Sequence, residues 1–154
     1  MEEFTTAWVR FRARGHPNVR ATHRTTLEIT RETHLTPRGD CIIAVESEIG
    51  LADLPASMKH EIRSGGLVVL AICARGICDS VAGWGSPELG LSDPDRIIIR
   101  RSTYTDSRTL MIRASKAARY LDRRLIRELQ AGAEAEILIS VIPRRRLGLR
   151  DRVE

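Results

Sequence analysis

LTPRGDCII at Leu35–Ile43 and LSDPDRIII at Leu91–Ile99 are two similar stretches of sequence, and they decide the predicted fold. Each reads as a polar turn that contains aspartate and leads into a buried strand. Each is then followed by an amphipathic helix, a glycine that stops the helix, and a further apolar strand. These last strands are GGLVVLAICA at Gly65–Ala74 and GAEAEILISVI at Gly132–Ile142. The sequence therefore indicates two copies of one unit, with the extra residues of the second copy in a hairpin at 105–108.

Two copies of such a unit predict an α+β domain, namely a mainly antiparallel β-barrel or sandwich with two packed helices and a pseudo-twofold internal repeat. Asp53 and Pro55 begin one helix, which Gly65 and Gly66 end, whereas Ser115 caps a longer one that runs to about residue 131. The chain has 154 residues and is 42% hydrophobic, which suffices for a single compact core. We assign residues 1–143 to this domain and residues 144–154 to a basic C-terminal tail.

The N-terminal region alternates apolar and basic residues in a way that predicts two strands. Val9, Phe11 and Ala13 share one face of the first strand, and arginines occupy the other. A second strand over 19–30, joined through a turn at 15–19, would place Arg14 opposite Arg20. The outer face of this predicted ribbon carries Trp8, Arg10, Arg12, Arg14, Arg20 and Arg24.

Composition favours a polyanionic partner. The net charge is +5, the sequence pI is about 9.7, and 23 arginines accompany only two lysines. A basic surface with an aromatic side chain is typical of proteins that grip single-stranded nucleic acid through phosphate contacts and base stacking. The predicted ribbon would act in this way, with RNA favoured over DNA. The alternatives are a solvated arginine face paired with acids, or a protein partner.

A polar group near the start of the chain suggests a different function. His16, His23, Glu28 and Asp40 could line the mouth of a barrel, where a histidine would act as acid, base or ligand donor. This is the alternative reading: a small-molecule enzyme, or a protein that binds a small molecule or phosphate ligand. A histidine on a buried strand face is equally explained by a hydrogen bond within the core.

The segment 102–109 is rich in hydroxyl groups and arginine. Ser102, Arg108 and Thr109 are therefore candidates for a phosphate-binding loop. A polar turn that serves only solubility explains the same residues.

Several chemistries find no support in the sequence. The motifs of dinucleotide folds, P-loop hydrolases, zincins and α/β-hydrolases are missing, so we expect no cofactor and favour a non-catalytic protein. Cys41, Cys73 and Cys78 lack the spacing of a zinc site, and we expect no metal; Cys41 and Cys73 read as small buried hydrophobic residues in a reducing cytosol. No stretch resembles a membrane span or a secretion signal, which predicts a cytoplasmic protein. An uncovered strand edge would also allow a homodimer.

The stretches GHPNVRATHRTTLEIT, LTPRGDCI and IIIRRSTYTDSRTLMIRASKAARYLDRRLIREL resemble an archaeal family of short proteins classified only as a domain of unknown function, DUF371. The resemblance covers nearly the whole chain. It implies an archaeal, cytoplasmic protein, and it implies no activity. It also implies that the fixed polar positions of the family fall on Gly15, His16, Asn18, His23, Thr26, Glu28, Thr30, Gly39, Asp40, Cys41, Ser102, Arg108 and Thr109.

Overall fold

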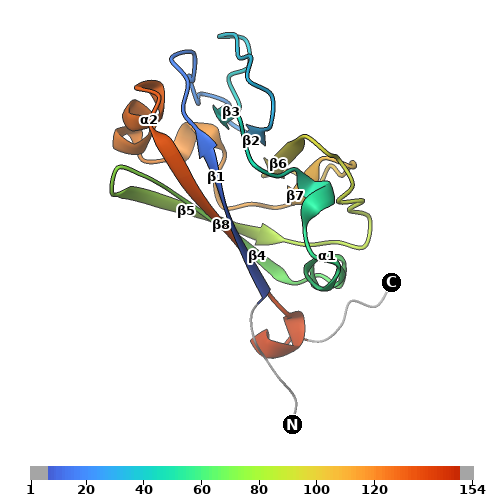
Figure 1. Cartoon of the computed structure of the whole chain (residues 1–154). Helices are drawn as coiled ribbons and strands as arrows, with labels where there is room; N and C mark the ends of the chain where they lie inside the picture. Colours follow the sequence, from blue (N-terminus) through green and yellow to red (C-terminus); the bar gives the residue numbers. More distant parts are fainter. Residues whose placement is uncertain (1–6, 150–154) are drawn as a thin grey trace.

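The computed structural model describes residues 7–149, which form eight strands, two α-helices and three short 3-10 helices (Figure 1). The α+β class is therefore confirmed. In chain order the elements are β1 (Ala7–Arg14), β2 (Thr26–Thr30), β3 (Ile42–Ala44), η1 (Leu51–Asp53), α1 (Ala56–Arg63), β4 (Leu67–Ala74), β5 (Ile77–Trp84), β6 (Arg96–Arg100), β7 (Thr109–Met111), η2 (Ala118–Tyr120), α2 (Arg123–Gln130), β8 (Glu134–Ile142) and η3 (Arg144–Leu147).

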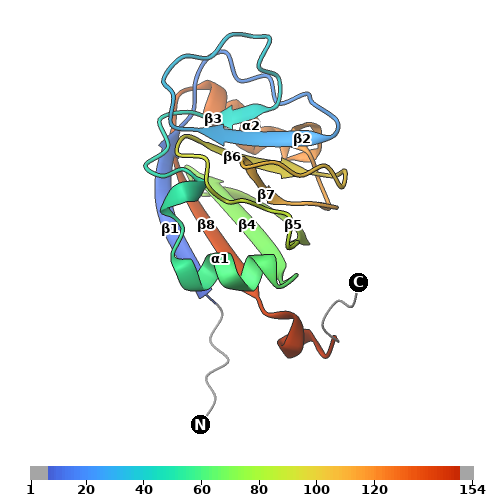
Figure 2. The ribbon, with the colours of Figure 1, turned by 90° about the vertical axis from the view of Figure 1, so that its right-hand side faces the viewer.

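The strands form two four-stranded sheets, one ordered β1-β8-β4-β5 and the other β3-β2-β6-β7. The first sheet is antiparallel throughout, whereas the second has an antiparallel centre, β2 with β6, and parallel outer pairs. Figure 2 shows the second sheet lying across one face of the first. The inward side chains of both sheets, such as Phe11, Leu70, Ile97 and Ile139, make one continuous hydrophobic core.

Isolated bridges join the two sheets at both edges. Arg14 at the end of β1 pairs with Val45, and Trp84 at the end of β5 pairs with Ile112. Within residues 7–149 these contacts do not merge the sheets into one closed barrel, because each bridge spans a single residue pair.

The predicted helix stops are confirmed, but the predicted start of the second helix is wrong. Gly65 and Gly132 follow the helices with φ of 87° and 83°, a left-handed conformation that glycine adopts without strain. The helix assigned to residues 115–131 begins only at Arg123. Asp122 caps it by accepting a hydrogen bond from the backbone N–H of Arg124, and the preceding turn is η2. The apolar periodicity continues from η2 into α2, so the sequence pattern does not reveal the break between them.

The order of three strands, a 3-10 helix, an α-helix and a strand occurs twice along the chain. The two series interlock through glycines that touch the helix of the other series. A Cβ atom on Gly15 would lie 1.9 Å from the carbonyl oxygen of Leu129 in α2, and one on Gly85 would lie 1.9 Å from that of Ile62 in α1. Both contacts require glycine, because any larger residue would separate the strand end from the helix.

Two predicted strand pairings are wrong. β1 pairs with β8 rather than with a strand over 19–30, so Arg14 lies opposite Glu134 instead of Arg20. Residues 15–25 form a loop, and β2 pairs with β6. The segment 105–108 is not a hairpin tip, since it connects the parallel strands β6 and β7. Period-two alternation identified β1 correctly, but the strand predicted over 19–30 is limited to 26–30, and the alternation could not identify the partner of either strand.

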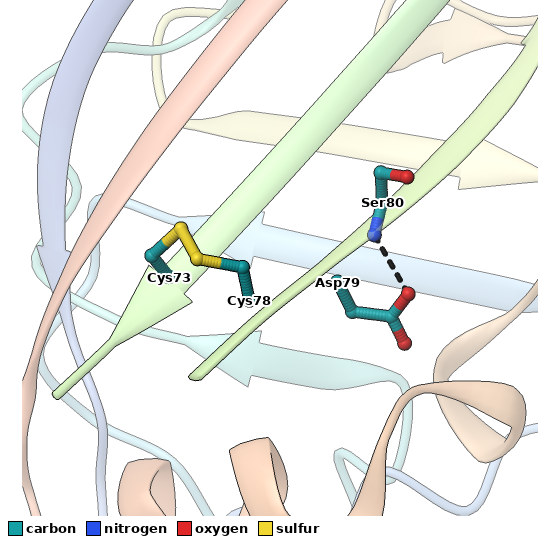
Figure 3. Close-up of a disulfide and its surroundings, with 4 residues drawn as sticks. All are labelled: Cys73, Cys78, Asp79 and Ser80. Carbon is teal, nitrogen blue, oxygen red and sulfur yellow. Dashed lines mark hydrogen bonds between the residues drawn. A yellow bond between two sulfur atoms is a disulfide. The ribbon is translucent and has the colours of Figure 1, made fainter. Parts of the chain in front are cut away.

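The prediction that Cys73 is a reduced, buried residue is also wrong. Cys73 and Cys78 are directly opposed on β4 and β5 and form a disulfide, drawn in Figure 3 beside Asp79 and Ser80. Arg75 and Gly76 form the two-residue turn between these strands with φ of 49° and 82°. Such a turn fixes the register that brings the cysteines together.

The predicted tail begins with an ordered turn. Arg145 in η3 pairs with Glu61 of α1 at 3.2 Å, and the guanidinium of Arg144 lies over the ring of Trp84. The other residues of the predicted tail, 150–154, lie outside the described part of the chain. Among residues 7–149, neither α1 nor α2 has the length and apolar character needed to cross a membrane.

Candidate nucleic-acid interface

The loop between β1 and β2, residues 15–25, is held against the segment that leads into α2. The backbone N–H of Arg119 in η2 donates to the carbonyl oxygen of His23 at 3.0 Å. Gln130 at the end of α2 donates to the carbonyl oxygen of Val19 at 2.8 Å. The loop therefore follows this segment from η2 to the last residue of α2, although more than 90 residues of sequence separate them.

Arg123 is the main side-chain link between this loop and α2. Its guanidinium donates to the carbonyl oxygens of Ala21 at 2.9 Å, Arg20 at 3.1 Å and Arg119 at 3.2 Å. All these partners are neutral, so the positive charge of Arg123 is hydrogen-bonded but not balanced by an acid. Burial, together with the positive charges of Arg119 and Arg127, lowers the pKa of Arg123.

A second contact extends this basic region to the loop after β6. The guanidinium of Arg101 lies over the ring of Tyr120, 5.0 Å from its centroid, and donates to the carbonyl oxygen of Arg24. Tyr120 remains 46% exposed, so its ring has free surface beside the arginine. An exposed aromatic ring among arginines can stack on a base.

These contacts define one surface, which we call the arginine patch. Within residues 7–149, no arginine of the patch forms a salt bridge with a carboxylate. Asp122 lies near Arg127 but forms its salt bridge with Arg124. Arginines close together without a salt-bridge partner repel one another, and a bound polyanion would relieve that repulsion. The patch consists of Arg101, Arg119, Arg123 and Arg127 with Tyr120, and of Arg20 and Arg24, whose backbone carbonyls accept hydrogen bonds from Arg123 and Arg101.

The patch is not flat. One hollow is lined by Thr22, Arg119 and Arg123, and another by Arg101, Ser115 and Tyr120. Arg119 of the first hollow and Tyr120 of the second are consecutive residues of η2. The first offers guanidinium and hydroxyl donors suited to a phosphate, and the second offers an aromatic face with a hydroxyl beside it.

The predicted ribbon residues are divided between two places. Trp8, Arg10, Arg12 and Arg14 lie on β1, whose neighbour β8 carries acids: Arg12 pairs with Glu134 at 3.7 Å. Arg20 and Arg24 lie in the loop that forms part of the arginine patch. Trp8 is 61% exposed but stands at the far end of β1 from this loop.

The residues of the alternative pocket have separate hydrogen-bonding partners. His16 accepts the N–H of Asn18, and His23 accepts the N–H groups of Thr25 and Thr26, each through Nδ1. The carbonyl oxygen of Asp40 accepts the backbone N–H of His23, which is a contact between main chains.

Glu28 is the buried acid of that group, with 5% of its surface exposed. It accepts hydrogen bonds from Arg96 at 2.8 Å and from the Cys41 thiol at 3.6 Å, and it contacts neither histidine. Burial raises the pKa of Glu28, against the opposing influence of Arg96 and Cys41. Burial and the nearby Glu28 charge raise the pKa of Cys41 to about 12, so this thiol is a poor nucleophile at neutral pH.

Two of the three phosphate-loop candidates, Arg108 and Thr109, donate hydrogen bonds to one acid, Asp106. Asp106 accepts hydrogen bonds from the guanidinium of Arg108 at 2.7 Å, the hydroxyl of Thr109 at 2.9 Å and the guanidinium of Arg100 at 3.0 Å. Burial alone would raise the pKa of Asp106, but these hydrogen bonds and charges lower it to about 2. Ser102 accepts the N–H of Tyr104. The segment thus stabilises its own loop.

Five residues of the patch were missed as site residues: Arg101, Arg119, Tyr120, Arg123 and Arg127. The sequence predicts that the arginines at 119, 123 and 127 form the charged face of a helix together with Glu128. Their spacing of four with one sign of charge is itself a signal, because like charges at this spacing destabilise a helix. No sequence pattern would place them beside the loop at 20–24.

Comparison with known proteins places the chain in a family. Residues 11–142 match the family described as Domain of unknown function (DUF371). The chain belongs to the DUF371 family. An uncharacterized protein of Methanocaldococcus jannaschii, MJ0206, is 41% identical over 123 residues, which cover 80% of this chain and 91% of that protein. The family predicted from the sequence motifs is confirmed, and a member from an archaeon supports the predicted archaeal origin.

Proposed function

We propose that this DUF371 protein is a non-catalytic module that binds single-stranded RNA through the arginine patch. The observation that carries the proposal is the set of arginines around Tyr120 with no carboxylate partner. Phosphates would balance the guanidinium charges, and bases would stack on the tyrosine. The proposal moves the predicted RNA surface from β1 to the loop and helix that hold Arg20 and Arg24.

The neighbouring hollows suit a single strand better than a duplex. Consecutive residues of η2 line one hollow with guanidinium and hydroxyl donors and another with an aromatic ring, and one unpaired nucleotide can supply a phosphate and a base. In duplex RNA the bases are stacked on each other and cannot reach an isolated tyrosine. We propose a cytoplasmic location, where such RNA is present.

We also propose that the chain is an internal repeat, arranged as a sandwich with a pseudo-twofold axis between β4 and β8 and between β2 and β6. The interlocked contacts of Gly15 with Leu129 and of Gly85 with Ile62 support the proposal. So do the left-handed φ values of 51° at both Ala21 and Leu91, six residues after each glycine. We refer to residues 7–74 and 77–142 as the two halves.

The binding proposal is tested by titrating labelled single-stranded RNA at low and moderate salt and following fluorescence anisotropy. Arg119→Gln/Arg127→Gln removes two patch charges that hold no loop carbonyl. Arg10→Gln/Arg14→Gln is the charge-matched control on β1. We expect the patch variant to bind about tenfold more weakly at low salt, with a salt slope lower by about 1.4, and the control to bind like the native protein. Equal losses in both variants, or no binding at low salt, would contradict the proposal.

A further inference from the structure

A disulfide at the surface closes the hairpin of β4 and β5. Cys73 is half-buried and Cys78 is exposed, and the two lie directly opposite each other on the two strands (Figure 3). β4 is a central strand and pairs with β8 as far as Cys73, whereas β5 is an edge strand. Among the described strands, β4 is thus the sole neighbour of β5 over residues 77–80. The disulfide is the covalent tie at the start of this edge strand.

The residue after Cys78 holds the start of α2. Asp79 Oδ2 accepts the backbone N–H of Asp122 at 2.7 Å, and Asp122 is the residue that caps α2. The other carboxylate oxygen of Asp79 accepts hydrogen bonds from the Lys116 ammonium and from the backbone N–H of Ser80. Burial alone would raise the pKa of Asp79, but these hydrogen bonds lower it, so the side chain is a charged acceptor at neutral pH.

The turn of the hairpin makes a second contact with the same helix. Arg75, in the turn that the disulfide closes, pairs with Glu128 of α2 at 3.2 Å. The disulfide therefore lies between two contacts to α2, one in the turn and one at Asp79. The helix of the first half differs, because α1 follows Pro55 and has no side-chain cap. It serves as a reference within the same molecule.

The helix held in this way carries part of the arginine patch. Arg123 directly follows the cap residue Asp122, and its guanidinium donates to the carbonyl oxygens of Arg20 and Ala21. A helix whose first turn is loosened no longer fixes this guanidinium against the loop. The contact of Asp79 with Asp122 therefore also positions Arg123.

A dithiol can reach the exposed sulfur of Cys78. Its first thiolate attacks that sulfur, and Cys73 leaves as a thiolate. The second thiol then attacks the mixed disulfide, which releases Cys78 and leaves the reductant as a disulfide. The cysteine pair gains two electrons and two protons, and the dithiol loses them. Cys41 does not compete, because burial and the nearby Glu28 charge raise its pKa to about 12.

We infer that the Cys73–Cys78 disulfide is a redox site open to cellular dithiols, and that its reduction loosens the hold of the hairpin on the start of α2. Exposed disulfides are more readily opened by reductants than buried ones. Without the bond, the start of β5 is free to separate from β4, and Asp79 moves with it. The effect on RNA binding rests on the proposed function, whereas the reduction and the loosening of α2 do not.

The redox site is tested by treating the folded protein with dithiothreitol, followed by alkylation and mass spectrometry. We expect Cys73 and Cys78 to be alkylated and Cys41 to stay unmodified. Oxidation by air should restore the bond. A bond that opens only in denaturant, or cysteines that do not form it on oxidation, would overturn the inference.

The hold on α2 is tested by NMR hydrogen exchange of the oxidised and reduced protein. We expect the protection of the Asp122 and Arg124 amides to fall about fivefold on reduction, while that of the Lys59 and Ser64 amides in α1 changes less than about twofold. Equal changes in both helices, or none at Asp122, would overturn the inference.

Two variants separate the disulfide from the contact that it supports. Cys73→Ser/Cys78→Ser should exchange like the reduced protein and should not respond to dithiothreitol. Asp79→Ala removes the contact itself, so reduction should lower the protection of the Arg124 amide in this variant by less than about twofold. A full effect of reduction in Asp79→Ala would overturn the inference.

The link to the patch is tested with the labelled RNA. We expect the reduced protein and Cys73→Ser/Cys78→Ser to bind about threefold more weakly than the oxidised protein. Equal affinity in the two redox states would overturn this link. Absence of RNA binding in both states would overturn the proposed function, and the exchange experiment would still decide the hold on α2.

Discussion

The arginine patch has a counterpart in the other half of the molecule with the same backbone contacts and a different chemical character. In both places the end of an α-helix donates a side-chain hydrogen bond to a loop of the other half: Gln130 to the carbonyl of Val19, and Arg63 to the carbonyl of Leu89. The backbone N–H of Gly15 bonds to the carbonyl of Ala133 at 2.8 Å, and that of Gly85 to the carbonyl of Gly66 at 2.9 Å. The counterpart face consists of Ala52, Asp53, Ala56, His60, Gly90 and Pro94. It also keeps one arginine, because Arg31 donates to the carbonyl of Pro94 as Arg101 donates to that of Arg24.

The difference between the two faces is one of charge. Arg119, Tyr120 and Arg123 stand where the counterpart face has an alanine, an aspartate and another alanine. The fold can therefore be built without arginine in these positions. Arginines needed only for solubility or heat stability would have no reason to gather on one of two equivalent faces, so the asymmetry supports a ligand for the patch.

The largest expected effects test whether the two halves have the same backbone structure at their glycine contacts. Gly15→Ala and Gly85→Ala each drive a Cβ into a helix carbonyl, so each should lower the free energy of unfolding by about 3 kcal/mol, measured by urea denaturation. Gly90→Ala is the control, because its nearest neighbour would be at an ordinary 3.5 Å. A large loss in only one of the two variants would show that the halves do not share this contact.

Part of this fold could be predicted from sequence, for identifiable reasons. The glycine stops at Gly65 and Gly132 and the buried runs of β4 and β8 depend on local chemistry, and the sequence predicts them correctly. The partner of β1 is β8, which lies 120 or more residues away in the sequence. The alternation of apolar and basic side chains in β1 cannot identify that partner. The arginine patch was missed for the same reason, since it forms only where the interlocked halves bring the loop at 20–24 onto α2.

Asp106, in the loop between the parallel strands β6 and β7, should respond to loss of its charge more strongly than Asp95, which directly precedes β6. Asp106→Asn should cost about 2 kcal/mol at pH 7, because hydrogen bonds from Arg108 and Thr109 lower the pKa of Asp106 to about 2. A lowered pKa stabilises the fold above the ordinary carboxyl pKa, so the difference should vanish as the pH falls from about 4 to about 2. Urea denaturation across this range measures it. Asp95→Asn, an exposed control, should change stability by less than about 0.5 kcal/mol, and an equal loss there would contradict the assignment.

Arginine substitutions on the counterpart face would show whether charge is enough to create an RNA site there. Ala52→Arg/Ala56→Arg/His60→Arg should create a second RNA site, about tenfold weaker than the first because it lacks the tyrosine. Native mass spectrometry at low salt would count the bound oligonucleotides. The same triple change to glutamine is the control and should leave one bound RNA. Failure to gain a second site would show that features beyond charge define the patch.

The smallest expected effect concerns Glu28. Burial raises its pKa, so its contribution to stability is present at low pH and lost as the pH rises through the folded-state value. Relative to the native protein, Glu28→Gln should therefore gain stability, by less than about 1 kcal/mol, between pH 4 and pH 8. Thermal unfolding over this range measures the difference. Glu32→Gln removes the exposed partner of the same Arg96 and should cost under about 0.5 kcal/mol; a gain with rising pH in that variant would contradict the burial argument.

The central claim is that RNA contacts the arginine patch, and amide chemical-shift mapping of the native protein during titration with single-stranded RNA tests it most directly. The account predicts that the shifts concentrate at 20–24, Arg101 and 115–127. It also predicts that β1 and the counterpart face stay unchanged. Shifts centred on Trp8 to Arg14, or spread equally over both faces, would contradict it.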